Sequence, residues 1–443
     1  MRGDAFGKLG HEGCTIGDTG RMALPAGMQF SALDPETDLE KVLRIDAWAY
    51  PGEVALPDLL GLEHPIPWGR TWGAAVKDGE LAAMYGSYGL QRLPVPGAEI
   101  SGSWLTWVGV HPGYRRRGIL REMIAHHFAD CLERGESISA LNAAEASIYG
   151  RFGYGMAAPQ ISLTIPRGAA LRDTPGSAEL TVELREWNGD RDGDQIAELH
   201  SSYARLPEGI GRPGWVTWET PELRRTVDQD PPALRQGLES QRLLIVRDAA
   251  GAARGYARFR RKGEWNRSVA DGTVQVRDVV GLDAAAAHRI WSVLLDLDLM
   301  ARVEAGPLTP DDAILTLLVD GRAALPTTND LEWVRILDLP SALAQRRYAA
   351  AVDVVIEVTD ALVPANAGRW RVAAEAYAHA AVTRTEADPD LKLDIRELGA
   401  AHLGSVSLAA LAQAGLVVGE PAVVARAATA WSWPIGAGSS WVF

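Results

Sequence analysis

The stretch VGVHPGYRRRGILREMI, residues 108–124, places three consecutive arginines and a glycine between two contrasting patterns. The segment before the turn, Ser103–Val110 (SWLTWVGV), is typical of a buried β-strand, and Pro112 and Gly113 indicate a turn. From Ile119 onward, apolar residues recur at helical spacing. The sequence therefore predicts a strand, a turn and a helix, with the arginines at the N-terminus of the helix.

A helix N-terminus flanked by arginines is a favourable place for an anion. Its free backbone N–H groups and the positive end of the helix dipole attract negative charge. Arginine adds forked donors with a permanent charge, and Gly118 lets the backbone approach an oxygen without a Cβ in the way. These features predict a pyrophosphate site. Three arginines alone are equally compatible with a solvated basic turn, so the surrounding residues must decide.

Length and composition bound the class of protein. The 443 residues suffice for two or three domains. A net charge of −13 argues against nucleic-acid binding and favours a cationic partner. No apolar run approaches the roughly 18 residues of a membrane helix. Two cysteines, Cys14 and Cys131, cannot form a disulfide framework, which favours a reducing cytoplasm. Residues 1–27 are Gly-rich and lack a signal-peptide core, so we expect a flexible extension.

Three segments follow this extension. Residues 28–170 and 181–329 each show a strand hairpin, a further strand and a helix. In the second of them the turn VVGLDAAAAH carries Asp283 where arginines would be needed, so no phosphate site is expected there. Residues 330–443 show alternating strands and then a helical stretch, which predicts an antiparallel sheet with helices on one side. The expected fold class is therefore mixed α/β and α+β, with two related domains followed by a third.

The arginine turn carries a family resemblance. VGVHPGYRRRGIL resembles the acetyl-CoA signature of the GNAT acetyltransferase superfamily, with Arg115 and Gly118 in matching positions and Leu120 where a small residue is usual. The resemblance implies that the strand end binds the pantetheine and acetyl groups through its backbone, and that the turn binds the pyrophosphate. The implied acetyl-CoA residues are Val108, Gly109, Val110, Arg115, Arg116, Arg117, Gly118, Ile119, Leu120, Arg121, Ala144 and Glu145.

A second string, EASIYGRFGYG (Glu145–Gly155), narrows the resemblance. Together with the arginine turn it resembles the Eis (enhanced intracellular survival) family of N-acetyltransferases, which act on aminoglycosides and lysines. The resemblance covers essentially the whole chain beyond the extension. It implies a catalytic GNAT domain (28–170), a degenerate GNAT-like domain without cofactor (181–329) and a sterol-carrier-like domain (330–443), assembled as a homohexamer.

The same resemblance implies an acid and a base. Acetyl transfer needs an acid for the departing thiolate and a base for the attacking ammonium, since deprotonating a lysine-like amine at pH 7 costs about 4.6 kcal/mol. The resemblance assigns the acid to Tyr149 and the base to the C-terminal carboxylate of Phe443. Asn142 and Ala144 stand where some family members carry histidine and serine, so side-chain contacts there are expected to differ.

Other chemistries have weaker support. His126 and His127 are adjacent on a predicted helix and point apart, so no metal site is expected. Four tryptophans are assigned to the core rather than to a cleft: Trp48, Trp68, Trp215 and Trp218. The resemblance to the Eis family thus implies direct acetyl transfer from acetyl-CoA to an amine. A lipid- or sterol-binding carrier with a vestigial acetyltransferase domain is the alternative, and the intact arginine turn argues against it. The physiological acceptor stays open.

Overall fold

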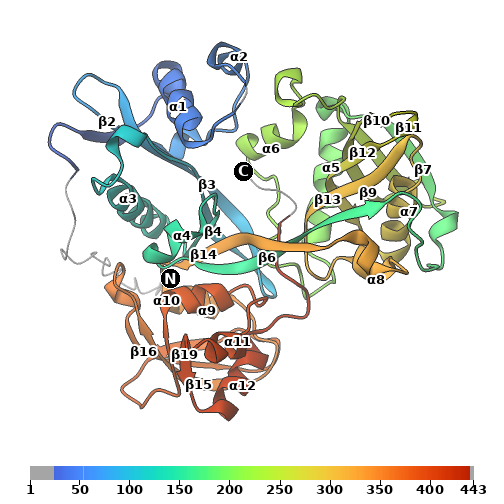
Figure 1. Ribbon diagram of the computed structural model, residues 1–443. Helices are drawn as coiled ribbons and strands as arrows, with labels where there is room; N and C mark the ends of the chain where they lie inside the picture. Colours follow the sequence, from blue (N-terminus) through green and yellow to red (C-terminus); the bar gives the residue numbers. More distant parts are fainter. Residues whose placement is uncertain (1–23, 53, 440–443) are drawn as a thin grey trace, which may run out of the picture.

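The computed structural model describes residues 24–52 and 54–439. It has a first part at the upper left of Figure 1, a second at the upper right and a third below. One mixed sheet runs through the first and second parts in the order β1-β2-β3-β4-β5-β14-β6-β13-β12-β9-β8-β7. Its strands are β1 (Gln29–Ala32), β2 (Thr71–Ala75), β3 (Leu81–Val95), β4 (Ala98–Val110), β5 (Ile138–Asn142), β6 (Gly155–Pro166), β7 (Thr181–Glu186), β8 (Arg242–Arg247), β9 (Ala253–Lys262), β12 (Gly272–Gly281), β13 (Met300–Leu308) and β14 (Thr327–Ile336).

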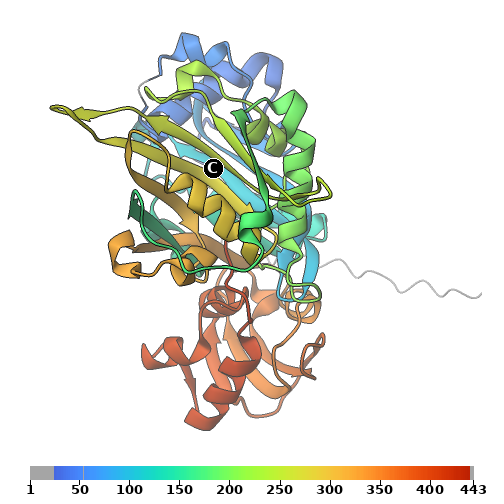
Figure 2. The ribbon, with the colours of Figure 1, turned by 90° about the vertical axis from the view of Figure 1, so that its right-hand side faces the viewer.

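The remaining elements cover this sheet or form the third part. The first part carries α1 (Pro35–Ala49), α2 (Leu56–Leu60), α3 (Ile119–Glu133) and α4 (Ala146–Tyr149). The second carries α5 (Gly189–Ala204), α6 (Pro221–Asp228), α7 (Ala284–Leu294), α8 (Ala313–Leu317) and the hairpin of β10 (Trp265–Asn266) and β11 (Val269–Ala270). The third consists of β15 (Val352–Thr359), β16 (Gly368–Ala374), β17 (Ala381–Arg384), β18 (Leu391–Asp394), β19 (Val417–Gly419), α9 (Leu339–Gln345), α10 (Ile395–Ala401), α11 (Leu408–Gln413) and α12 (Pro421–Trp431). Figure 2 shows the third part below the other two.

The predicted strand, turn and helix around the arginines are confirmed as β4, a 3-10 turn at Pro112–Tyr114, and α3. The second part repeats this strand–helix–strand arrangement. Helix α7 joins the parallel strands β12 and β13, as α3 joins the parallel strands β4 and β5. At the N-terminus of α7, however, the Asp283 carboxylate accepts a hydrogen bond from the Ala286 N–H and pairs with Arg254 at 2.6 Å. This helix end is already occupied by a negative charge.

β14 joins the parts of the chain. It pairs antiparallel with β5 on one edge and with β6 on the other. The segment boundary proposed near residue 330 therefore falls inside a strand of the large sheet. The smaller sheet, β17-β16-β15-β18-β19, also differs from the antiparallel prediction, because β15 and β18 are parallel. After the hairpin of β16 and β17 the chain crosses back to the opposite edge of β15, which reverses the direction of the pairing.

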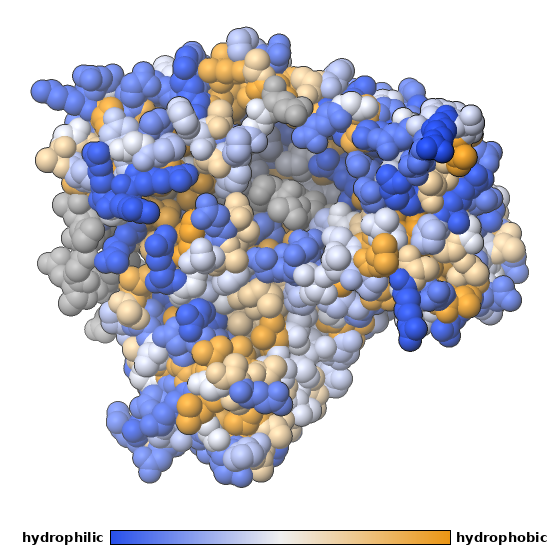
Figure 3. Space-filling model, in the orientation of Figure 1, coloured by the Kyte–Doolittle hydropathy of each residue, from blue (hydrophilic) through white to orange (hydrophobic). Residues whose placement is uncertain are grey.

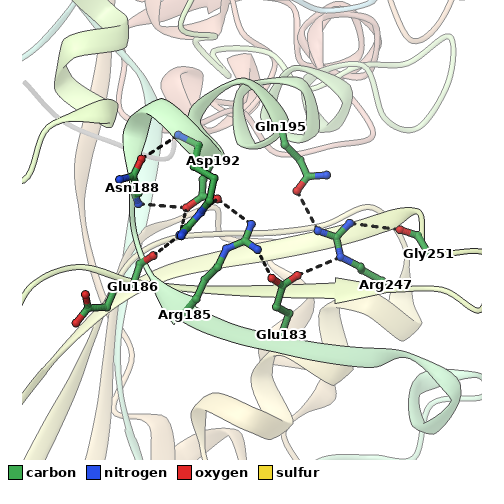
Figure 4. A network of polar contacts seen from close by, with 9 residues as sticks. Glu183, Arg185, Glu186, Asn188, Asp192, Gln195, Arg247 and Gly251 are labelled. Atoms are coloured by element: carbon green, nitrogen blue, oxygen red, sulfur yellow. Dashed lines mark hydrogen bonds and ion pairs between the residues drawn. The ribbon is translucent and has the colours of Figure 1, made fainter.

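A buried carboxylate holds α5 against β7 in the second part (Figure 4). Asp192 is fully buried in the first turn of α5 and accepts hydrogen bonds from the guanidinium groups of Arg185 and Arg191 and from the Asn188 N–H. Arg185 extends from β7, so the carboxylate links strand and helix. A buried charge satisfied in this way fixes the register of the two elements.

A second buried ion pair fastens the third part to β14. Arg335 of β14 donates to both carboxylate oxygens of Asp360 at 2.7 and 2.8 Å, and neither side chain is more than 1% exposed. Asp360 also accepts hydrogen bonds from the Val363 N–H and from the amide of Asn366.

Within the described ranges no helix is both long and apolar enough to cross a membrane.

We predict that Asp360→Ala lowers the free energy of unfolding by about 3–5 kcal/mol, because it leaves the Arg335 charge buried without a partner. Urea unfolding followed by circular dichroism measures the loss. Asp353→Ala is the matched control, because Asp353 forms a similar two-oxygen pair with Arg371 on the exposed face of the third part, where both side chains are more than half exposed. The control should change little. Equal losses in both variants would contradict the prediction.

Candidate active site

The candidate site begins where β4 and β5 separate. The two strands pair only at Ser103–Ser139 and Trp104–Ala140, and Trp107 has a positive φ of 52° that bends β4 just beyond this pairing. A cavity of about 680 Å³ lies beside the free end of β4. It is lined by Ala49, Tyr50, Val108, Val110, Tyr114, Arg115, Arg116, Gly118, Ile119, Leu120, Arg121, Ala144, Glu145, Ile148, Tyr149, Arg151, Phe152 and Leu362.

The structure brings most of the residues predicted to bind acetyl-CoA to this cavity. Gly109 and Arg117 are the exceptions among them. Gly109 lies beneath α1, where a Cβ would come within 2.7 Å of Ile45. Arg117 turns away, donates to the Gly113 carbonyl at 3.1 Å and lies over the Tyr114 ring. The remaining predicted residues form the wall from the end of β4 to the first turn of α3, and Ala144 and Glu145 add to it from the segment between β5 and α4.

The N-terminus of α3 has the chemistry of an anion site. Gly118 begins the helix with a φ of +83°, and no described side chain caps the N–H groups that follow it. Arg115, Arg116 and Arg121 line the same end of the cavity, and none of the three pairs with a carboxylate of the described chain. Uncapped N–H groups beside unpaired guanidinium groups fit a pyrophosphate.

Tyr149 lies in the wall of the cavity at the end of α4. It is 7% exposed, and burial, followed by the nearby Tyr50 phenol and Glu145 carboxylate, raises the pKa of its phenol above the ordinary value. The phenol therefore keeps its proton at physiological pH. Tyr154 lies behind it, fully buried, with its hydroxyl 2.8 Å from that of Ser139, which suits a structural role.

A glycine in the IYGRFGYG string packs against a side chain of β14. Gly153 has a φ of +82°, and a Cβ there would come within 2.8 Å of the Arg335 guanidinium. The loop that carries Tyr149 thus packs directly on the arginine that pairs with Asp360. A larger residue at this position would displace the loop, because both the backbone conformation and the space exclude it.

Several cavity residues were missed by the sequence analysis. Tyr114, Ile148, Arg151 and Phe152 lie within the two quoted strings and could have been included. No local motif marks the other three. Ala49 ends α1, Tyr50 follows it, and Leu362 belongs to the third part. Trp48 was assigned to the core, but it is 59% exposed and its ring contacts His111 at the end of β4. Trp215 and Trp218 are buried as predicted.

Two predictions fall on residues outside the described ranges. They are the role of Phe443 as the base and the flexibility of residues 1–23 in the expected extension. The last described residues lie against the second part, where the Gly436 N–H donates to Asp311 and the Gly438 N–H to the Pro213 carbonyl. In Figure 3 the face of the molecule is hollowed between the first and second parts.

The described residues contain no group of three or more side chains placed to hold a metal ion.

Comparison with known proteins places this geometry in a family. The chain matches models of an acetyltransferase (GNAT) domain over residues 34–157 and 214–336, and a model of a sterol carrier protein domain over residues 339–435. The fold is therefore two GNAT domains followed by a sterol-carrier-type domain. GNAT enzymes take their acyl group from acyl-CoA.

Relatives match over most of the chain. An uncharacterized N-acetyltransferase of Streptomyces coelicolor is 38% identical over 79% of this chain and 83% of its own. N-acetyltransferase Eis of Mycobacterium tuberculosis is 32% identical over 81% of this chain and 86% of its own. The crystal structure of Eis1 from Mycobacterium abscessus superimposes with a TM-score of 0.75 at 28% identity, covering 94% of this chain and all of that one. The chain is an N-acetyltransferase and belongs to the Eis family of the GNAT superfamily.

Proposed function

We propose that the protein transfers an acetyl group from acetyl-CoA directly to amines of aminoglycoside-type or lysine-containing acceptors. The observation that supports this most is the single cavity that has an uncapped, arginine-flanked helix N-terminus at one end and the Tyr149 phenol in its wall. Acetyl-CoA supplies an activated thioester. Arg115, Arg116 and the first N–H groups of α3 would hold its pyrophosphate, and the free edge of β4 at Val108–Val110 would bind its pantetheine arm.

The transfer needs two proton movements. The acceptor nitrogen attacks the acetyl carbonyl, the new C–N bond forms and the C–S bond breaks. Tyr149 gives its proton to the departing thiolate, a role supported by its place in the cavity wall and its protonated state. A carboxylate takes one proton of the acceptor ammonium, and the second proton lost from that nitrogen restores the Tyr149 phenol. Each turnover thus converts a cationic amine to a neutral amide and releases CoA as the thiol together with one proton.

The proposed base is the terminal carboxylate of Phe443. An ordinary α-carboxyl, with a pKa of about 3.5, is a weak base unless desolvation raises that value. The support is the family resemblance together with the course of the last described residues. A Cβ on Gly438 would lie 3.8 Å from Leu331, whose carbonyl accepts a hydrogen bond from Asn142 at the end of β5. The tail therefore approaches the strand end beside the cavity.

Assembly and location are also proposals. A homohexamer and a cytoplasmic location rest on the resemblance to Eis proteins and on the cysteine content. The net charge of −13 suits cationic acceptors such as aminoglycosides.

Turnover of acetyl-CoA, followed by thiol release against a panel of aminoglycosides and lysine peptides, tests the proposal. We expect acetylation of amines by the chain ending at Phe443, and loss of most of it in a chain extended by one glycine, because the extension moves the carboxylate. The melting temperature with acetyl-CoA is the control and should rise equally in both. Full turnover by the extended chain would exclude the Phe443 carboxylate. A chain that binds acetyl-CoA but acetylates no amine would contradict the acceptor class.

Tyr149→Phe tests the acid. Removing the phenolic hydroxyl should lower kcat by about 10²–10⁴-fold, the usual contribution of a positioned acid, and leave the KM for acetyl-CoA nearly unchanged. Tyr154→Phe is the matched control. It removes the hydrogen bond to Ser139 and should cost about 1 kcal/mol of stability without a comparable loss of kcat. A Tyr149→Phe enzyme with wild-type kcat at all pH values would exclude Tyr149 as the acid.

A further inference from the structure

One carboxylate beside the cavity has no role in the account above. Asp46 lies on α1, whose buried residues Val42, Leu43 and Ile45 form an apolar stripe against the sheet. Helical spacing places Asp46 inside this stripe, four residues after Val42. A charged side chain in such a stripe is normally paired. Asp46 instead makes no side-chain hydrogen bond or ion pair with the described part of the chain.

α1 places Asp46 next to residues that line the cavity. Its residues Ile45 and Ala49 pack on Gly109, next to the two valines of β4 that line the cavity. Ala49 and Tyr50 are themselves part of the lining, and the Tyr50 N–H donates to the backbone carbonyl of Asp46 at 2.7 Å. Residues four apart lie on one helix face. Asp46 and Tyr50 are therefore neighbours.

The groups around Asp46 suit a cation. Tyr50 interacts electrostatically with both Asp46 and Glu145, and Tyr149 with both Tyr50 and Glu145. The elements packed on α1 are β3, β4 and α2. The apolar cluster around α1 contains Leu81 and Met84 of β3 and Trp107 of β4, together with Ile66 from the segment after α2. From other elements, Glu145 and Tyr149 interact with Tyr50, and His111, which follows β4, contacts the Trp48 ring of α1. Two carboxylates and two phenols thus lie near one another at or beside the wall of the cavity.

We propose that the Asp46 carboxylate binds the ammonium group of the acceptor beside the cavity and so selects cationic amines. This inference rests on the proposed acetyl transfer to amines. An ammonium group supplies the partner that the half-buried carboxylate lacks, and charge-assisted hydrogen bonds of this kind are stronger than neutral ones. Removal of the acceptor's proton remains the task of the base discussed above, so Asp46 acts through binding.

The pH dependence follows from the surroundings of Asp46. Burial raises the pKa of its carboxyl to about 6 in the free protein. The carboxylate is then lost as the pH falls through 6, and with it the affinity for the ammonium group. We expect kcat/KM for the acceptor to fall below about pH 6 in the wild-type enzyme. Acceptor binding at this pH should also release a proton, because the bound cation favours the charged carboxylate.

Asp46→Asn tests the proposal, with Asp58→Asn as control. Asp58 is an exposed residue of the neighbouring helix α2, so the control makes the same chemical change and alters the net charge equally. We expect Asp46→Asn to raise the acceptor KM about tenfold or more, to change kcat less than threefold and to remove the decline of kcat/KM near pH 6. The melting temperature of Asp46→Asn should not fall, because a desolvated charge has been removed. Asp58→Asn should match the wild type.

An unchanged acceptor KM together with a persisting decline near pH 6 would overturn the role of Asp46. If the wild-type enzyme acetylates no amine, the proposed function fails, and binding alone then decides the inference. An aminoglycoside, added in the presence of CoA, should raise the melting temperature of the wild type and of Asp58→Asn but not of Asp46→Asn. An equal rise in all three proteins, or no rise in any, would overturn it.

Discussion

The pairing of β14 on both of its edges is the constraint on which the site depends. Because β14 lies between β5 and β6, those two strands are separated by two strand spacings, about 9.6 Å. The loop that carries Tyr149 connects β5 to β6 and must cross the end of β14. It does so through α4 and a turn at Gly153, packed on Arg335. The buried pair of Arg335 and Asp360 then links this loop to the third part, and Leu362 from that part reaches the cavity wall.

The two GNAT domains differ at the N-terminus of the helix that joins their parallel strands. In the first, α3 begins at Gly118 with uncapped N–H groups and free arginines beside them. In the second, Asp283 caps α7 and is itself paired with Arg254. The carboxylate satisfies the N–H groups and would repel a phosphate. The fold survives this exchange because the helix and the parallel strands do not depend on the anion.

The strand, turn and helix around Arg115–Gly118, and the place of Tyr149 in the site, could be predicted from the sequence. A few consecutive residues determine each of them. The position of β14 was not predictable in this way. Its residues alternate as in any strand, and nothing local indicates which strands it will join. Leu362, Tyr50 and Asp46 were missed for the same reason, because tertiary packing brings them to the cavity. For Asp46 a signal existed, since it interrupts the apolar stripe of α1.

We expect only the first of the two GNAT domains to bind the acyl donor, at the arginine turn. Isothermal titration calorimetry with acetyl-CoA on the wild-type chain and on Arg115→Ala/Arg116→Ala tests it most directly. The account predicts one site per chain, an affinity that falls as salt is raised, and a large loss of affinity in the double variant. Two sites per chain, or a single site indifferent to both arginines, would contradict it.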